Sequence, residues 1–243
     1  LVMNTTGFSM ILGQMEQSAM YNAYNFSHPS ANGTAVNSSP NTKLIGTCYV
    51  NSTVVGAKIA TFQCPSDEEM PVENSISVNY FRINARRSNY KFCVSIYQDA
   101  YCAASASPSM NIRGMFYSDL STNIAQITDG TSNTAAVGEA RQRTYSTNWG
   151  TWWGVGNHTA VHGLVYPPTT GGYTRYLPNG VYDNVLNVEK LPYAWTMGSK
   201  HPGGMNMLFG DGSVKFIKNT INASTWYSIN TIAGGEIVSS DAF

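Results

Sequence analysis

The segment HPGGMNMLFGDGSVKFIK, residues 201–218, decides the fold that we expect of this chain. An apolar run at 205–209 leads into the tetrapeptide GDGS at 210–213, and alternating apolar and polar residues follow. Two such runs around a glycine-rich turn predict a β-hairpin, since glycine adopts a positive φ without steric cost. We expect Asp211 to lie in the turn and to accept backbone N–H bonds, with Gly212 beside it.

The same segment places His201 ten residues before Asp211. An imidazole and a carboxylate can form an acid–base pair in which the carboxylate orients the ring. The alternative is structural: His201 forms a local hydrogen bond where the strand begins, and Asp211 and Gly212 close the turn. We favour the structural interpretation, because no Gly-x-Ser-x-Gly elbow is present to supply a nucleophile. No catalytic residue is assigned, and we do not expect an enzyme.

Outward from the hairpin, the chain mixes short helices, short strands and long loops. Apolar residues recur at three- and four-residue steps over 7–24, which predicts an N-terminal helix capped by Thr6. Asn222 is expected to cap a second helix. Residues 145–195, rich in Gly, Pro, Tyr and Trp, are expected to form surface loops. The prediction is one α+β domain over residues 1–243, dominated by antiparallel β-structure.

Composition narrows the class of protein further. The chain has 243 residues, with Lys plus Arg equal to Asp plus Glu at 14 each, and only 12% of its residues are charged. That charge content is about half of the usual quarter. The balance argues against nucleic-acid partners and polybasic membrane contact. A near-neutral surface rich in Asn, Ser and Thr has little self-repulsion, which favours a secreted protein or an assembly subunit.

The chain offers no apolar run of about 18 residues that would span a bilayer as a helix. It begins with Leu1 instead of an initiator Met, so we expect a processed or truncated chain. Membrane contact is expected only through an N-terminal segment that this sequence does not contain.

Four cysteines are expected to form disulfides. They show no C-x-x-C spacing, and the chain has only 4 histidines, so zinc is not expected. Spacing favours Cys48 with Cys64 and Cys93 with Cys102, although four cysteines allow three pairings. Disulfides require an oxidising compartment, which again favours an extracellular location.

Three further patterns suggest binding. A cluster of tryptophans could stack on sugars or form a protein interface if exposed, and could fill a core if buried; its members, together with a fourth tryptophan nearby, are Trp149, Trp152, Trp153 and Trp195. Asp129, Thr131 and Asn133 alternate as at the start of a calcium loop, but an Asx-turn is the favoured interpretation and no cofactor is expected. Glycosylation sequons occur at Asn4, Asn25, Asn32, Asn37, Asn51, Asn157 and Asn222.

Several segments together resemble one family. They are MILGQMEQSAMYNAYNFS at 10–27, FQCPSD at 62–67, ITDGTSNTAAVGE at 127–139, the stretch from His201 through FGDGSVKFI, and AGGEIVSSDAF at 233–243. Their order and spacing resemble the pilin-like proteins described as prepilin-type processing-associated H-X9-DG proteins. The resemblance implies a relative of type IV pilins or pseudopilins without the usual N-terminal apolar helix.

The resemblance and the composition lead to one expected function and two alternatives. The leading expectation is a secreted structural subunit of an extracellular filament, tube or surface assembly, with itself as partner. The first alternative is a carbohydrate- or surface-binding module that uses the tryptophans. The second is a secreted hydrolase that uses His201 and Asp211.

Overall fold

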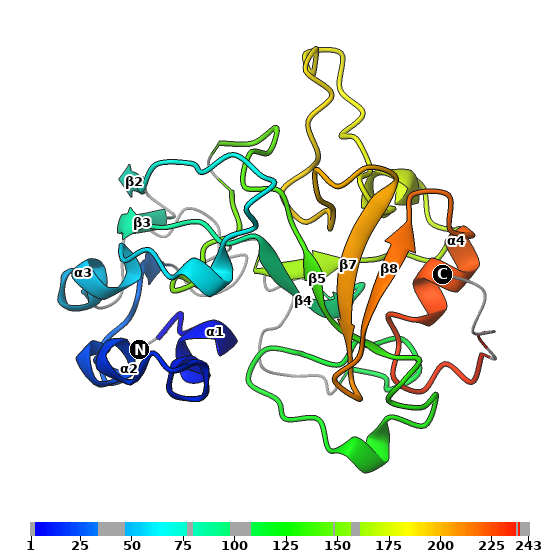
Figure 1. Cartoon of the computed structure of the whole chain (residues 1–243), viewed down its shortest axis with the longest axis horizontal. Helices are drawn as coiled ribbons and strands as arrows, with labels where there is room; N and C mark the ends of the chain where they lie inside the picture. The colour runs from blue at the N-terminus through cyan, green and yellow to red at the C-terminus, as the bar shows by residue number, and fades with distance from the viewer. Residues whose placement is uncertain are drawn as a thin grey trace.

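The chain folds around two β-sheets in a computed structural model that describes residues 3–33, 47–76, 80–97, 108–147, 149–156, 161–236 and 238. The larger sheet has five strands in the order β6-β4-β5-β7-β8 (Figure 1). Its strands are β4 (Tyr90–Ser95), β5 (Ala135–Glu139), β6 (His162–Leu164), β7 (Gly204–Phe209) and β8 (Val214–Lys218). All its pairs are antiparallel except β4 with β6, which run parallel.

The hairpin predicted from residues 201–218 is present as β7 and β8. Their register runs from Gly204 opposite Lys218 to Leu208 opposite Val214. Gly212 has a φ of 86°, a left-handed conformation that favours glycine at this turn. This hairpin forms one side of the larger sheet, with β8 as its outer strand.

The smaller sheet lies toward the N-terminal part of the chain (Figure 1). It has the order β1-β3-β2, with strands β1 (Asn32–Gly33), β2 (Glu73–Ile76) and β3 (Tyr80–Ala85). Both of its pairs are antiparallel. Short α-helices and 3-10 turns (η) surround the sheets: α1 (Gly7–Met10), η1 (Leu12–Met15), α2 (Ser18–Ala23), η2 (Tyr49–Asn51), α3 (Ser52–Val55), η3 (Ala60–Phe62), η5 (Ile124–Gln126), η6 (Tyr173–Tyr176) and α4 (Ala223–Ser228).

The predicted pilin-like α+β fold with an N-terminal helix is wrong. The structure is mostly sheet, and no α-helix among the described residues exceeds six residues. Thr6 does cap α1, since its side chain accepts from Ser9 N. The helix does not continue, because Glu16 adopts a left-handed φ of 58° after η1. The apolar period of this segment therefore reflects three short turns that bury Phe8 and Leu12.

In the part of the chain that the structure describes, three hydrophobic clusters form the core, and β4 contributes to each. Phe92 packs in the cluster of the N-terminal part, Cys93 in the cluster around β7, and Val94 in the cluster that includes Trp195. Within the described ranges, no helix is long and apolar enough to cross a membrane.

Candidate functional site

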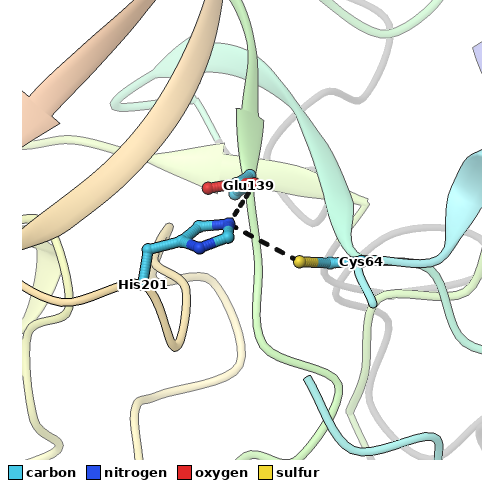
Figure 2. A group of neighbouring side chains, drawn as sticks. All are labelled: Cys64, Glu139 and His201. Carbon is cyan, nitrogen blue, oxygen red and sulfur yellow. Dashed lines mark hydrogen bonds and ion pairs between the residues drawn. The ribbon is translucent and has the colours of Figure 1, made fainter. Parts of the chain in front are cut away.

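Three side chains from distant parts of the sequence meet beside the larger sheet: Cys64, Glu139 and His201 (Figure 2). Cys64 follows η3, Glu139 ends β5, and His201 precedes β7. The Cys64 Sγ lies 3.7 Å from His201 Nε2, and the Glu139 Oε1 lies 3.2 Å from the same nitrogen. One ligand-type atom from each residue lies within 4.8 Å of the other two.

The geometry of this cluster does not match a nucleophile–base–acid triad. In a triad, the nucleophile and the carboxylate contact opposite nitrogens of the imidazole. Here the thiol and the carboxylate both contact Nε2. The arrangement instead points three donor atoms at one small volume, as the ligands of a metal ion do.

Glu139 is held in place by the neighbouring strand. Its Oε2 accepts a hydrogen bond of 2.6 Å from the backbone N–H of Asn206, and its Oε1 accepts one of 3.3 Å from the Asn206 side chain. The Glu139 side chain is only 6% exposed. Because a buried carboxylate needs partners, these bonds fix its orientation toward His201.

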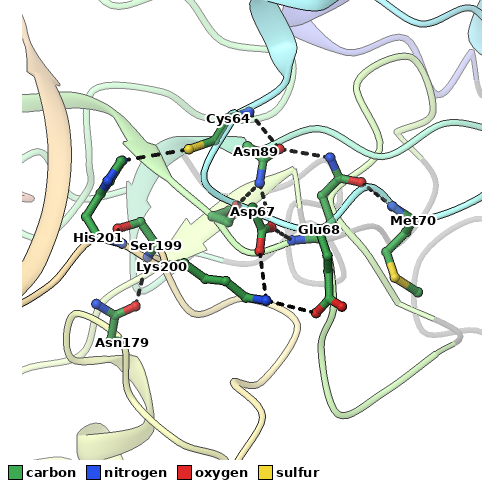
Figure 3. Close-up of polar contacts among 11 residues, drawn as sticks. Cys64, Asp67, Glu68, Met70, Asn89, Asn179, Ser199, Lys200 and His201 are labelled. Atoms are coloured by element: carbon green, nitrogen blue, oxygen red, sulfur yellow. Dashed lines mark hydrogen bonds and ion pairs between the residues drawn. The ribbon is translucent and has the colours of Figure 1, made fainter.

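Cys64 and His201 are held through their backbones (Figure 3). The Cys64 N–H donates to Asn89 Oδ1 at 3.0 Å. Asn89 Nδ2 in turn donates to Asp67 Oδ2 and to the backbone oxygen of Ala140, the residue that follows β5. The His201 N–H donates to Ser199 Oγ at 3.1 Å. Lys200 turns away to Glu68, 3.3 Å distant. Hydrogen bonds from neighbouring residues therefore hold the three side chains of the cluster in position.

Tyr90 lies at the edge of this cluster. It pairs with Glu139 across β4 and β5, and directly opposed residues of an antiparallel pair share one face of the sheet. Burial raises the pKa of the Tyr90 phenol, and the nearby charges of Glu139 and Cys64 raise this pKa further. The phenol is thus a neutral group beside two acidic side chains.

The pairing of His201 with Asp211, on which the hydrolase alternative depends, does not form. The two residues lie at opposite ends of β7, a separation of about 20 Å for six residues of strand. Asp211 lies in the turn, where its Oδ1 accepts from Ser213 N at 2.9 Å and Ser213 Oγ at 2.7 Å. The hydrogen bonds from Ser213 lower the pKa of the Asp211 carboxyl. Asp211 contributes to the turn and His201 to the three-residue cluster.

The predicted disulfides are corrected by the structure. Cys48, Cys64 and Cys93 are all buried free thiols, so Cys48 and Cys64 are not bonded. Cys93 lies 3.9 Å from the Met197 sulfur in the core, and Cys102, its predicted partner, lies outside the described residues. Burial raises the pKa values of Cys48 and Cys93, which makes both thiols unreactive. Short spacing in sequence did not bring these residues together, because Cys64 faces His201.

The tryptophans are core residues. Trp152, Trp153 and Trp195 are between 0% and 2% exposed, and the Trp153 Nε1–H donates to Ala57 O. Trp149 is half-buried, with its ring 5.2 Å from that of Trp195. Three of the four rings are buried and the fourth is half-buried, which favours the core-filling interpretation over a sugar-stacking surface.

The candidate calcium loop is occupied by internal hydrogen bonds. The Asp129 carboxylate accepts from Gly234 N at 2.7 Å and from Gly235 N at 2.9 Å. Asn133 Nδ2 donates to Asp129 O, and Thr131 O accepts from Asp211 N. The loop therefore joins the hairpin turn to the C-terminal segment.

The sequon asparagines have different surroundings. Asn32 and Asn51 are buried, Asn4 is half-buried, and Asn25 and Asn222 are exposed. Asn51 bonds to backbone atoms of residues 25, 28 and 29, and it cannot carry a glycan in this fold. Asn37 and Asn157 lie outside the described residues.

The fold and cluster define a β-rich protein in which an H-X9-DG hairpin supplies a histidine to a cysteine–glutamate–histidine site. The chain belongs to the family described as protein of unknown function DUF1559, the prepilin-type H-X9-DG-associated group, whose family model matches residues 3–224. No curated protein and no solved structure matches the chain.

The three-residue cluster was not predicted from the sequence, although all three residues lie in segments that carry the family resemblance. Cys64 lies in FQCPSD, Glu139 ends ITDGTSNTAAVGE, and His201 begins the H-X9-DG stretch. Each of these three segments thus contributes one side chain to the cluster. The sequence did contain one usable signal: each of the three segments has a residue of a type that binds metals. The spacing of residues within a single segment gave no such signal.

Proposed function

We propose that this chain is a structural subunit of an extracellular filament, tube or cell-surface assembly, built by contacts between copies of itself. The observation that carries the proposal is a projecting loop between Val181 and Pro192, the gold loop at the top of Figure 1. Three apolar side chains on it are almost fully exposed: Val185 at 94%, Leu186 at 75% and Val188 at 83%. Adjacent exposed apolar side chains of this kind typically mark an interaction surface.

The loop has a defined shape. A β-bridge joins Val181 to Pro192 at its base. Asn187, only 3% exposed, spans the interior, with its Nδ2 bonded to Tyr182 O and Leu191 O and its Oδ1 accepting from Leu191 N. Tyr182 also stacks on Tyr193 at a ring distance of 4.5 Å. A preorganised loop loses little conformational entropy on binding, which favours its use as a contact.

A second copy of this chain is the partner that fits best. The formal net charge is zero, so copies do not repel one another. The outer strand β8 carries exposed Val214 and Phe216, which offer a second apolar surface on a different element from the loop. A contact between two different surfaces of identical subunits is head-to-tail, and it produces a filament when it does not close into a ring.

Membership of the family is compatible with a surface or pilin-associated protein, and the extracellular location is part of the proposal. The proposal does not depend on disulfides, since Cys48, Cys64 and Cys93 are free thiols. It assigns no catalytic residue: the chain acts through assembly.

The test replaces the three exposed side chains of the loop together: Val185→Asp, Leu186→Asp and Val188→Asp. The wild-type protein is expected to associate in light scattering and to form filaments or a lattice in native microscopy. The triple variant should need at least about tenfold more protein to associate, which corresponds to roughly 1.4 kcal/mol of lost contact energy.

Ile124→Asp is the matched control, because Ile124 is 71% exposed in η5, away from the loop. It should leave association unchanged. A wild-type protein that stays monomeric at high concentration and forms no assembly on cells would contradict the proposal, as would an equal effect of the control.

A further inference from the structure

We propose that Cys64, Glu139 and His201 bind one zinc ion, through Sγ, a carboxylate oxygen and Nε2. The inference is independent of the proposed assembly function. It stands on three ligand-type atoms that lie within 4.8 Å of one another, with Cys64 and Glu139 both facing the same nitrogen of His201 (Figure 2), and on two separations close to those of a zinc site.

Two distances within the cluster are close to those between the ligands of a zinc ion. Zinc bonds of about 2.3 Å to sulfur and about 2.0–2.1 Å to nitrogen and oxygen, at tetrahedral angles, separate sulfur from nitrogen by about 3.5 Å and nitrogen from oxygen by about 3.4 Å. The observed separations are 3.7 Å between Cys64 Sγ and His201 Nε2 and 3.2 Å between His201 Nε2 and Glu139 Oε1. These two separations are within a few tenths of an ångström of the zinc values, and the third, from sulfur to a carboxylate oxygen, is at most 4.8 Å, so a zinc ion would draw these two atoms closer together.

Hydrogen bonding alone explains the arrangement less well. A neutral imidazole carries at most one proton on Nε2, which can point along only one direction. Nε2 therefore offers either one proton or one lone pair, yet both the Glu139 carboxylate and the Cys64 thiol, which is a weak donor and a weak acceptor, approach it. A metal ion in the space between the three atoms satisfies all of them at once.

The donor set and its surroundings favour zinc over other cations. Thiolate and imidazole are ligands of zinc, whereas calcium and magnesium prefer oxygen. The Glu139 carboxylate receives a second bond from Asn206 N, and Asn89 positions the Cys64 backbone, which is the supporting shell expected of a metal site. With three protein ligands, a tetrahedral ion keeps one position for water. The His201 side chain is 27% exposed, so this side of the cluster lies near solvent.

Metal binding would join three separate parts of the fold. Cys64 belongs to the segment after η3, Glu139 to the centre of the larger sheet, and His201 to the entry of the β7–β8 hairpin. Because the site does not exist in the unfolded chain, its binding energy adds to folding stability.

The experiment uses the full chain, reduced and freed of metal with a chelator, and titrates it with Zn²⁺ alone and with Co²⁺ alone. We expect one zinc per chain by calorimetry and by metal analysis after dialysis. Cobalt should give a thiolate-to-metal charge-transfer band and the intense visible bands of a tetrahedral site. At free zinc about 100-fold above its dissociation constant, the unfolding midpoint should rise by about 5–10 °C.

The variants Cys64→Ser, Glu139→Gln and His201→Gln keep the size of each side chain. Each should lower zinc affinity at least about tenfold, as loss of a first ligand or its support does. Cys48→Ser and His28→Gln, which alter a thiol and an imidazole outside the cluster, should bind zinc as the wild type does.

Any of three outcomes would overturn the inference. The first is a folded wild-type protein that binds no zinc at micromolar concentration. The second is binding without a thiolate-to-cobalt band, and the third is binding that the three cluster variants leave unchanged; both would indicate surface ligands. The cobalt spectrum is taken on the wild type, so it decides the question even if a variant fails to fold.

Discussion

At the residue scale, surroundings decide what a histidine does. His201 is partly exposed and faces two acidic side chains. His162, at the start of β6, has a buried Nδ1 with no hydrogen-bond partner. Burial lowers the pKa of His162 to about 4. His201 thus contacts a carboxylate and a thiol, whereas His162 is a packing residue that is neutral near pH 7 and whose protonation is disfavoured.

His162 predicts a loss of stability on acidification. Its folded pKa of about 4 is below the ordinary value of about 6.5, so the unfolded chain binds more protons between these two pH values. The free energy of unfolding should therefore fall as pH drops from about 6.5 to 4, by about 2–3 kcal/mol. Urea denaturation measured across this range, compared with His162→Gln, checks the effect.

The variant serves as the control because glutamine does not titrate. Its stability should show a smaller slope over the same pH range. Identical slopes for the two proteins would mean that His162 does not carry the penalty.

How far the residue roles could be predicted depends on distance along the chain. Thr6, Asp211 and Asn222 bond to backbone atoms two or three residues away, so local sequence was sufficient for them. The cluster is different, because 62 residues separate His201 from Glu139 and 137 separate it from Cys64. No spacing rule covers a contact that only the folded sheet creates.

At the element scale, the same contrast separates the hairpin from the N-terminal helix. Both strands of the hairpin and its turn are specified within residues 201–218, and each local preference agrees. The N-terminal segment has a helical apolar period, but tertiary packing breaks it at Glu16. Periodicity alone does not distinguish one helix from several short turns that bury the same side chains.

The cap of α4 provides a prediction at this scale. Asn222 Oδ1 accepts from Ser224 N at 2.8 Å and Thr225 N at 3.4 Å, which satisfies two N–H groups that the helix leaves unpaired. Asn222→Ala should lower the free energy of unfolding by about 1 kcal/mol. Asn222→Asp, which keeps the acceptor, should cost much less. Thermal and urea denaturation measure both; equal losses would contradict the capping role.

At the scale of the whole molecule, buried charged side chains connect different parts of the core through hydrogen bonds and ion pairs. Lys91 of β4 is buried, and its Nζ donates to Ala194 O and Thr196 O, in the segment that carries Trp195. Burial lowers the pKa of Lys91 well below its usual value. Arg87, 2% exposed, pairs with Glu73 of β2 and donates to Gln142 O beyond β5. Lys91 thus joins β4 to the segment of the third cluster, and Arg87 joins the smaller sheet to the segment that follows β5.

These buried hydrogen bonds and ion pairs predict that the chain unfolds in one cooperative transition, as expected of a single domain over residues 1–243. Each core cluster contains or contacts its own tryptophan: Trp152 and Trp153 in the first, Trp226 in the second, Trp195 and Trp149 in the third. After fluorotryptophan labelling, all the fluorine signals should therefore disappear at one common urea concentration, coincident with the loss of far-ultraviolet circular dichroism.

The variant Arg87→Met tests how much the buried contacts of Arg87 contribute to the stability of the whole chain. It leaves Glu73 and the Gln142 carbonyl without their buried partner, so the common midpoint should fall by about 3 kcal/mol of unfolding free energy without splitting. Lys58→Met removes an exposed pair with Glu69 and should change stability little, since solvent already screens that pair. If the Trp152 and Trp226 signals were lost at different urea concentrations in the wild type, the two sheets would be separate folding units, and the cluster of Cys64, Glu139 and His201 would lie at their boundary.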